Sequence, residues 1–99
     1  TEYHLHHFEE ECVYVLSGRG LAVLGEQLQP IGPGDFIGCP ANGIAHELIN
    51  DGEEPLLCLV VGQRRAHGVV DYPRLDKRLF RNAGEWNLVD QVDIEHVKR

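Results

Sequence analysis

Short apolar and β-branched runs alternate with turn-forming residues along the first two thirds of the chain. Turns rich in glycine, proline and asparagine recur roughly every eight to twelve residues, a spacing typical of an all-β sandwich or barrel. Pro33 and Gly34 suit the centre of a type II turn, because proline presets φ and glycine accepts a positive φ. No segment favours a helix. The runs between the turns predict strands at residues 12–16, 20–24, 36–39, 44–49 and 56–61.

The last third of the chain carries weaker strand patterns. Residues 69–72 and 78–81 are expected to form edge strands, with Pro73 ending the first of them. Residues 83–99 are expected to be weakly ordered or to pack on the barrel. The whole chain is short enough to form a single domain, with its core at about residues 1–82.

Composition and charge limit the kinds of partner that the chain is expected to bind. The 99 residues include 16 acidic and 9 basic side chains, a formal net charge of −7, which disfavours binding to nucleic acid or an anionic membrane. The longest apolar run, residues 56–61, is too short to span a membrane. Cys12, Cys39 and Cys58 form no C-x-x-C pair, so we expect buried free thiols and a reducing, cytoplasmic setting.

Histidines near the start of the chain are the first indication of a functional site. His4 and His6 are separated by one residue, so both imidazoles can share a face of an extended segment. Glu11 follows His6 at an odd offset, which requires a bulge or turn between them. With that break, Glu11 comes into phase with the apolar positions Val13 and Val15. A carboxylate on such a face is costly unless a cation neutralises it, so the spacing favours a metal.

His46 lies on the strand predicted at residues 44–49. It keeps phase with Ile44 and Leu48, so we expect it to point into the core while Glu47 points to solvent. A buried, hydrogen-bonded imidazole is the alternative for His46 taken alone.

Two groups of residues resemble the two conserved motifs of the cupin superfamily. The first motif is matched by His4, His6, Glu11 and Gly18. The second, with one extra residue in a turn, is matched by Gly34, Pro40, Gly43, His46 and Asn50. The resemblance implies a small jelly-roll β-barrel. Cupins usually have strands before the first motif and this chain begins three residues before it, so N-terminal strands are expected to be missing.

The resemblance also implies one divalent metal ion, held by His4, His6, Glu11 and His46. Glu9 or Glu10 could replace Glu11 if the bulge differs. A donor set of nitrogen and oxygen suits Fe, Mn, Ni, Co, Zn or Cu without choosing among them. An octahedral ion with four protein ligands would keep two positions open for a small molecule in the barrel.

Different classes of function fit this site. One is a metal-dependent dioxygenase or isomerase of the cupin type, with candidate bases identified by polarity only: Tyr3, His7, Tyr14 and Glu47. The alternative is a module that binds or senses a small ligand without turnover. A barrel that uses the metal only for stability is a third hypothesis.

Two surface features bear on partners. Open strand edges, together with apolar residues on alternate faces, predict a homodimer; the residues are Leu21, Val23, Leu57 and Leu59. A basic stretch comprises Arg64, Arg65, Arg74, Arg78 and Arg81. These arginines are expected to pair with acidic neighbours such as Asp71 and Asp76, or to bind an anionic substrate at the barrel mouth.

Overall fold

The computed structural model describes residues 2–98, which form strands and one short 3₁₀ helix. The strands are β1 (Leu5–His6), β2 (Glu11–Ser17), β3 (Gly20–Leu24), β4 (Gln27–Ile31), β5 (Phe36–Cys39), β6 (His46–Ile49), β7 (Leu57–Gly62), β8 (His67–Tyr72), β9 (Lys77–Asn82) and β10 (Glu85–Asp90). The 3₁₀ helix spans Gln91–Asp93. Within residues 2–98, no helix has the length and apolar character needed to cross a membrane.

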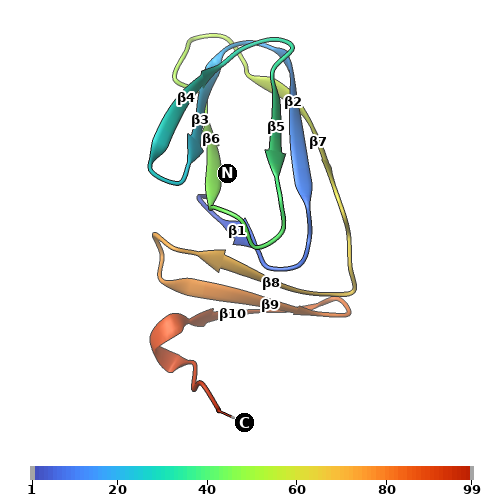
Figure 1. The fold of residues 1–99 in the computed structure, drawn as a ribbon, viewed down its shortest axis with the longest axis vertical. Helices are drawn as coiled ribbons and strands as arrows, with labels where there is room; N and C mark the ends of the chain where they lie inside the picture. The colour runs from blue at the N-terminus through green and yellow to red at the C-terminus, as the bar shows by residue number, and fades with distance from the viewer. Residues whose placement is uncertain (1, 99) are drawn as a thin grey trace.

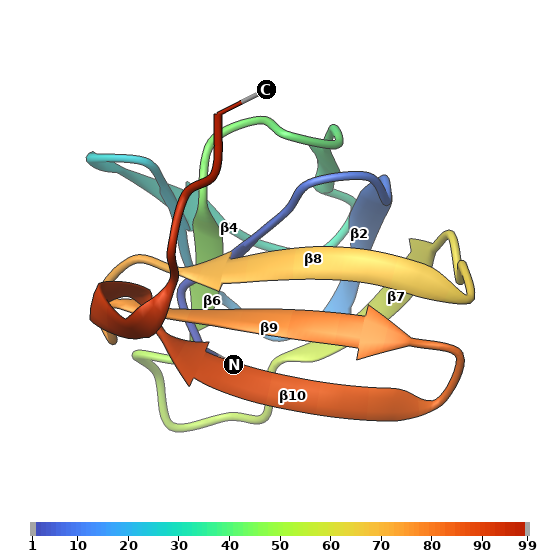
Figure 2. The same cartoon turned by 90° about the horizontal axis from the view of Figure 1, so that it is seen from below.

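Antiparallel pairing arranges the strands in three sheets, with strand orders β5-β2-β7, β4-β3-β6 and β1-β8-β9-β10. The first two sheets stand opposite each other, and the third lies across their lower end in the view of Figure 1. Figure 2, seen from below, shows β8, β9 and β10 side by side across that end. A bridge between His4 and His46 ties the segment before β1 to β6. The predicted all-β fold is confirmed.

The hydrophobic core lies between the two facing sheets. On β2, Val13 and Val15 are buried, whereas Tyr14 between them and Leu16 after them are about half exposed. This alternation is the period of a strand with one face against the core. The buried cluster comprises Val13, Val15, Ala22, Ile31, Ile37 and Cys39.

Most of the strands expected up to residue 62 form at or close to their predicted positions. Strand β4 was missed, because its short segment contains Pro30, which is unusual within a strand; four of its five residues are exposed. β8 and β9 are longer than predicted and are interior strands of their sheet, so the prediction of edge strands is wrong. β8 is interior because β1 pairs with its other edge, and β9 is interior because β10 pairs with it along its whole length. This strand was also missed, since it lies in the stretch expected to be weakly ordered or packed on the barrel.

The predicted turn at Pro33 and Gly34 is present: Gly34 has a φ of 88°, and the backbone N–H of Asp35 donates to the carbonyl of Gly32 at 3.1 Å. A stricter glycine requirement applies at Gly18, between β2 and β3. Gly18 also has a positive φ of 83°, and a Cβ there would clash with the carbonyl oxygen of Pro55. Nothing lies within 4 Å of the corresponding position at Gly34.

These two glycines make a matched pair for a stability experiment. Gly34→Ala is expected to lower the free energy of unfolding by about 1–2 kcal/mol, the cost of a left-handed alanine. Gly18→Ala adds a backbone clash, so we expect a loss of about 3 kcal/mol or more. Urea denaturation measures both. Equal losses would show that the backbone at Pro55 moves away from the new Cβ with no further loss of stability.

Candidate metal centre

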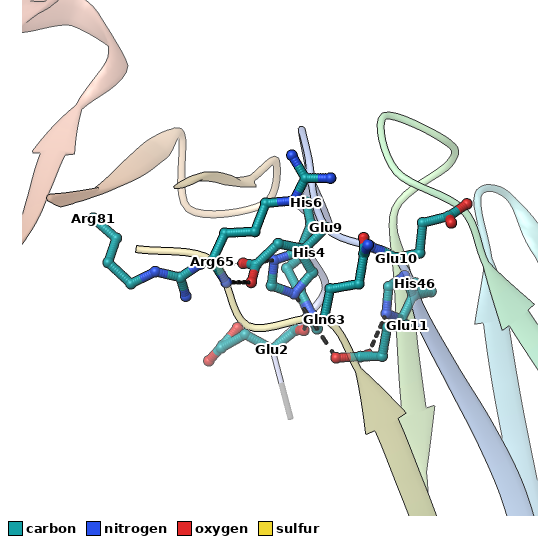
Figure 3. Close-up of polar contacts among 10 residues, drawn as sticks. All are labelled: Glu2, His4, His6, Glu9, Glu10, Glu11, His46, Gln63, Arg65 and Arg81. Atoms are coloured by element: carbon teal, nitrogen blue, oxygen red, sulfur yellow. Dashed lines mark hydrogen bonds and ion pairs between the residues drawn. The ribbon is translucent and has the colours of Figure 1, made fainter. Parts of the chain in front are cut away.

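Three predicted ligands meet at the end of the barrel that faces the third sheet. His4 and His6 come from the β1 segment, and Glu11 is the first residue of β2. One potential donor atom from each lies within 4.8 Å of the others (Figure 3). The chain leaves β1 after His6 and enters β2, in a different sheet, at Glu11. The non-strand residues between them supply the irregularity that the odd spacing requires.

His46 lies directly against this group without being one of its three members. Its side chain is nearly buried, and its Nε2 atom is 3.2 Å from Oε1 of Glu11. Its ring centroid is 4.6 Å from that of His4. The inward orientation is as predicted, although Ile44, expected to share that face, precedes β6 and is 61% exposed. Glu47, which was expected to point to solvent, forms an ion pair with Arg74.

Hydrogen bonding fixes which nitrogen of His4 is available. Its Nδ1 atom lies 2.6 Å from the carbonyl oxygen of Glu2. A carbonyl only accepts, so Nδ1–H is the donor and Nε2 of the neutral ring keeps its lone pair. That lone pair is what a metal ion requires, and the contact with Glu2 holds the ring in place.

The charges at His6 and Glu11 also suit a cation. Burial, followed by the repulsive effect of His4, lowers the pKa of His6, which favours the neutral, ligating form. A hydrogen bond from His46 lowers the pKa of Glu11 and outweighs the opposing effect of burial. Glu11 is therefore ionised near neutral pH. The Nε2 atom of His6 and Oε2 of Glu11 are 3.8 Å apart.

The pKa of His46 is shifted in the opposite direction to that of His6. The adjacent Cys39 thiol, and then the Glu11 carboxylate, raise its pKa to about 9. In the metal-free protein, His46 is therefore protonated near neutral pH and donates to Glu11. A metal ion would have to replace that proton, because only the neutral ring can ligate.

The three consecutive glutamates have different surroundings. Glu9 is 5% exposed; its carboxylate is paired with Arg81 and accepts a hydrogen bond from the backbone N–H of Arg65 at 2.8 Å. Glu10 is exposed, and its backbone N–H donates to the side chain of Gln63. Within residues 2–98, only the Glu11 carboxylate joins His4 and His6 in a group of potential ligands. This geometry favours Glu11 over the two alternatives.

The candidate bases are engaged elsewhere or lie on another face. Tyr3 donates its hydroxyl to the carbonyl of Gly25, and His7 is 2.7 Å from Asp71. Tyr14 pairs across strands with exposed neighbours on the outer face of β2. With Glu47 bound to Arg74, these four side chains offer no free base at the histidine group.

Sequence reasoning missed the supporting role of Glu9. One of its oxygens lies 3.8 Å from Nδ1 of His6, on the side of the ring away from Glu11. On the other side of Glu9, Arg81 reaches the carboxylate across β8, where Gly68 leaves room: a Cβ there would lie 2.7 Å from Arg81 Nη2. A run of three glutamates carries no local signal for this role, because Arg81 is far along the sequence. The predicted pairing of arginines with acids holds for Arg78, which binds Asp71.

The spacing of the donors can be compared with what a metal ion needs. Bonds of about 2.1 Å place neighbouring ligand atoms about 3–3.4 Å apart in octahedral or tetrahedral geometry. The 3.8 Å between His6 and Glu11 is slightly wider than that, and small side-chain movements would close the gap. Two neutral imidazoles and one carboxylate are also a usual donor set for divalent transition metals. The residues present therefore fit such an ion.

The chain belongs to the cupin family, since a family model described as a cupin domain matches residues 1–62. The comparison with curated proteins gives no match.

Two solved structures share the fold. One is of a proposed sugar phosphate isomerase from Acidithiobacillus ferrooxidans, with 57% identity and a TM-score of 0.96; the alignment covers 100% of this chain and 64% of that one. The other is of a sugar phosphate isomerase of the cupin superfamily from Silicibacter pomeroyi, with a TM-score of 0.89 over 98% of this chain and 62% of that one. At 24% identity, the second supports the fold alone. The chain thus spans a little under two thirds of each.

Proposed function

We propose that this chain forms the metal-binding barrel of a sugar phosphate isomerase, with one divalent cation held by His4, His6, Glu11 and His46. The observation that carries the proposal is the convergence of three donor atoms within 4.8 Å, with His46 on Glu11 beside them. The 57% identity, over the whole chain, to a proposed sugar phosphate isomerase supports the substrate class.

The group could supply the Lewis acid of this reaction, whereas Tyr3, His7 and Glu47 are engaged elsewhere and supply no free base. Isomerisation of a sugar moves a proton between adjacent carbon atoms while a carbonyl changes place. A bound divalent cation would polarise that carbonyl as a Lewis acid. The neutral imidazoles of His4 and His6 would hold the cation without reducing its charge, whereas Glu11 would cancel one unit. Two shallow hollows border Glu11, one beside Pro40 and one beside Gln63.

The proposal is tested by incubating metal-loaded protein with a panel of aldose and ketose phosphates in deuterium oxide. Isomerisation through proton transfer is expected to produce the second sugar and to place deuterium beside the carbonyl, both visible by NMR. Chelation of the metal should abolish both signals, and so should His4→Ala. Loss of product with retained binding of the sugar phosphate would contradict the isomerase and favour the binding module. Oxygen consumption instead would indicate the dioxygenase.

We also propose that the chain forms a homodimer through the outer face of the β5-β2-β7 sheet. Register places Tyr14 beside Phe36 and Leu59, and all three are 43–66% exposed. Leu57 is exposed on the same strand as Leu59, whereas Val23, from the central strand β3, is buried and cannot contribute as predicted. Sedimentation at tens of micromolar is expected to show a dimer that Leu59→Lys dissociates. A monomer would contradict this assembly.

A further inference from the structure

A second polar cluster begins where the histidine group ends. Glu9 separates the two: His6 lies on one side of its carboxylate, with the Arg81 guanidinium and the backbone of Arg65 on the other (Figure 3). Because Glu9 is almost fully buried, these contacts fix its position. The Arg81 guanidinium and the backbone of Arg65 are therefore placed at a defined site beside the candidate metal centre.

Beyond Glu9 is a hollow of about 370 Å³. It is lined by the loop Arg64–Ala66, by Arg81, and by the β9–β10 turn with Trp86. The guanidinium carbon of Arg81 lies 5.7 Å from the centre of the Trp86 ring, which helps to hold the side chain. Three of the nine basic residues of an otherwise acidic chain thus meet at one hollow.

The positive charge of this hollow is mostly unbalanced. Glu9 neutralises Arg81, but the side chains of Arg64 and Arg65 form no ion pair within residues 2–98. The buried Nε–H of Arg81 also has no hydrogen-bond partner in the described part of the chain.

We propose that Arg64 and Arg65, with Arg81 behind them, bind the phosphate group of a phosphorylated sugar. Guanidinium groups match the oxygens of a phosphate with paired hydrogen bonds, and their charge persists at every relevant pH. The choice of a sugar as the rest of the ligand rests on the proposed function. The phosphate site itself stands on the arginines.

The position of the hollow fits one substrate that reaches both sites. Gly62 and Gln63 line the hollow next to Glu11, and the following residues, Arg64 and Arg65, line the arginine hollow. A sugar phosphate lying along residues 62–65 would place its phosphate on the arginines and its other end toward Glu11.

The test compares two double variants of equal charge. Arg64→Ala with Arg65→Ala removes the proposed phosphate ligands but keeps the backbone N–H that supports Glu9. Arg19→Ala with Arg74→Ala removes two exposed arginines that do not line the hollow. The probe is inorganic phosphate, titrated calorimetrically into metal-free protein at constant ionic strength with chloride as the competing anion. Metal-free protein excludes phosphate binding to the ion.

Wild type and the Arg19/Arg74 variant are expected to bind phosphate equally, and the Arg64/Arg65 variant about tenfold or more weaker. Undetectable binding by wild type at 10 mM phosphate, about the weakest affinity worth assigning to a site, would overturn the proposal. Equal binding by both variants would also overturn it. Should the double variant fail to fold, Arg64→Gln alone carries the same comparison.

The outcomes separate this inference from the proposed function. Phosphate binding that depends on the arginines, without any isomerisation, leaves the site standing and removes the isomerase. Isomerisation of sugar phosphates with an unchanged KM in the Arg64/Arg65 variant keeps the isomerase and overturns the site.

Discussion

Replacing Glu11 with glutamine is expected to weaken divalent-metal binding by about a hundredfold or more. The amide keeps the shape of the side chain and removes the negative charge that a cation needs. It also replaces the charged acceptor of a protonated His46, 3.2 Å away in the metal-free protein, with a neutral amide oxygen, which weakens that contact. The lost charge lies on a proposed ligand atom itself, so no other single glutamate is expected to matter as much.

Glu10→Gln provides the control, because it removes one negative charge from the adjacent, exposed position. Calorimetric titration with Mn²⁺ or Co²⁺ should give an affinity within about twofold of wild type for this variant, as for a screened surface charge. Thermal denaturation gives a second readout: metal at about 100 times Kd should stabilise wild type by about 2.7 kcal/mol. An equal effect of both substitutions would contradict Glu11 as the ligand and reopen the choice among the glutamates.

Replacing Arg81 with methionine is expected to lower the free energy of unfolding by about 3–5 kcal/mol, because it leaves the buried Glu9 carboxylate without its counter-charge. The side chains of Glu9 and Arg81 are only 6% and 15% exposed. The exposed pair of Lys77 and Asp90 is the control, at 36% and 51%. Lys77→Met is expected to cost less than about 1 kcal/mol, since exposed ion pairs contribute little.

A double variant distinguishes the lost charge partner from lost packing. Glu9→Gln combined with Arg81→Met removes the unpaired charge, so it should recover much of the stability lost by Arg81→Met alone. Urea denaturation at neutral pH measures the free energy of unfolding of wild type, the two single variants and the double variant. If the double variant is no more stable than Arg81→Met, the Arg81 side chain stabilises the fold mainly by covering apolar surface.

Residues close in sequence made most of the barrel predictable. Val13 and Val15 alternate with Tyr14 and Leu16 as a half-buried strand requires, and β2 is found there. Polar and apolar residues alternate over part of β4 and β10, but both kinds are mainly exposed, so these strands have no buried face. Such strands are stabilised by hydrogen bonds to a neighbour, and the pattern of a single segment does not contain that neighbour.

The candidate site also has residues that could be predicted from the sequence and one that could not. His4 and His6 could be paired from their spacing, and Glu11 required only the break that the preceding polar residues supply. The function of Glu9 could not be predicted, since it depends on Arg81 in a strand 72 residues away.

The sequence by itself determined an acidic, all-β cupin domain and the residue types of its candidate metal group, because local alternation, turns and short motif spacings are written along the chain. Only the tertiary structure placed the Glu11 carboxylate in one group with His4 and His6. It also showed that the sheet β1-β8-β9-β10 crosses the end of the barrel, and that three arginines gather behind Glu9. These results depend on contacts between distant segments, which form when the strands pair and the barrel packs against that sheet.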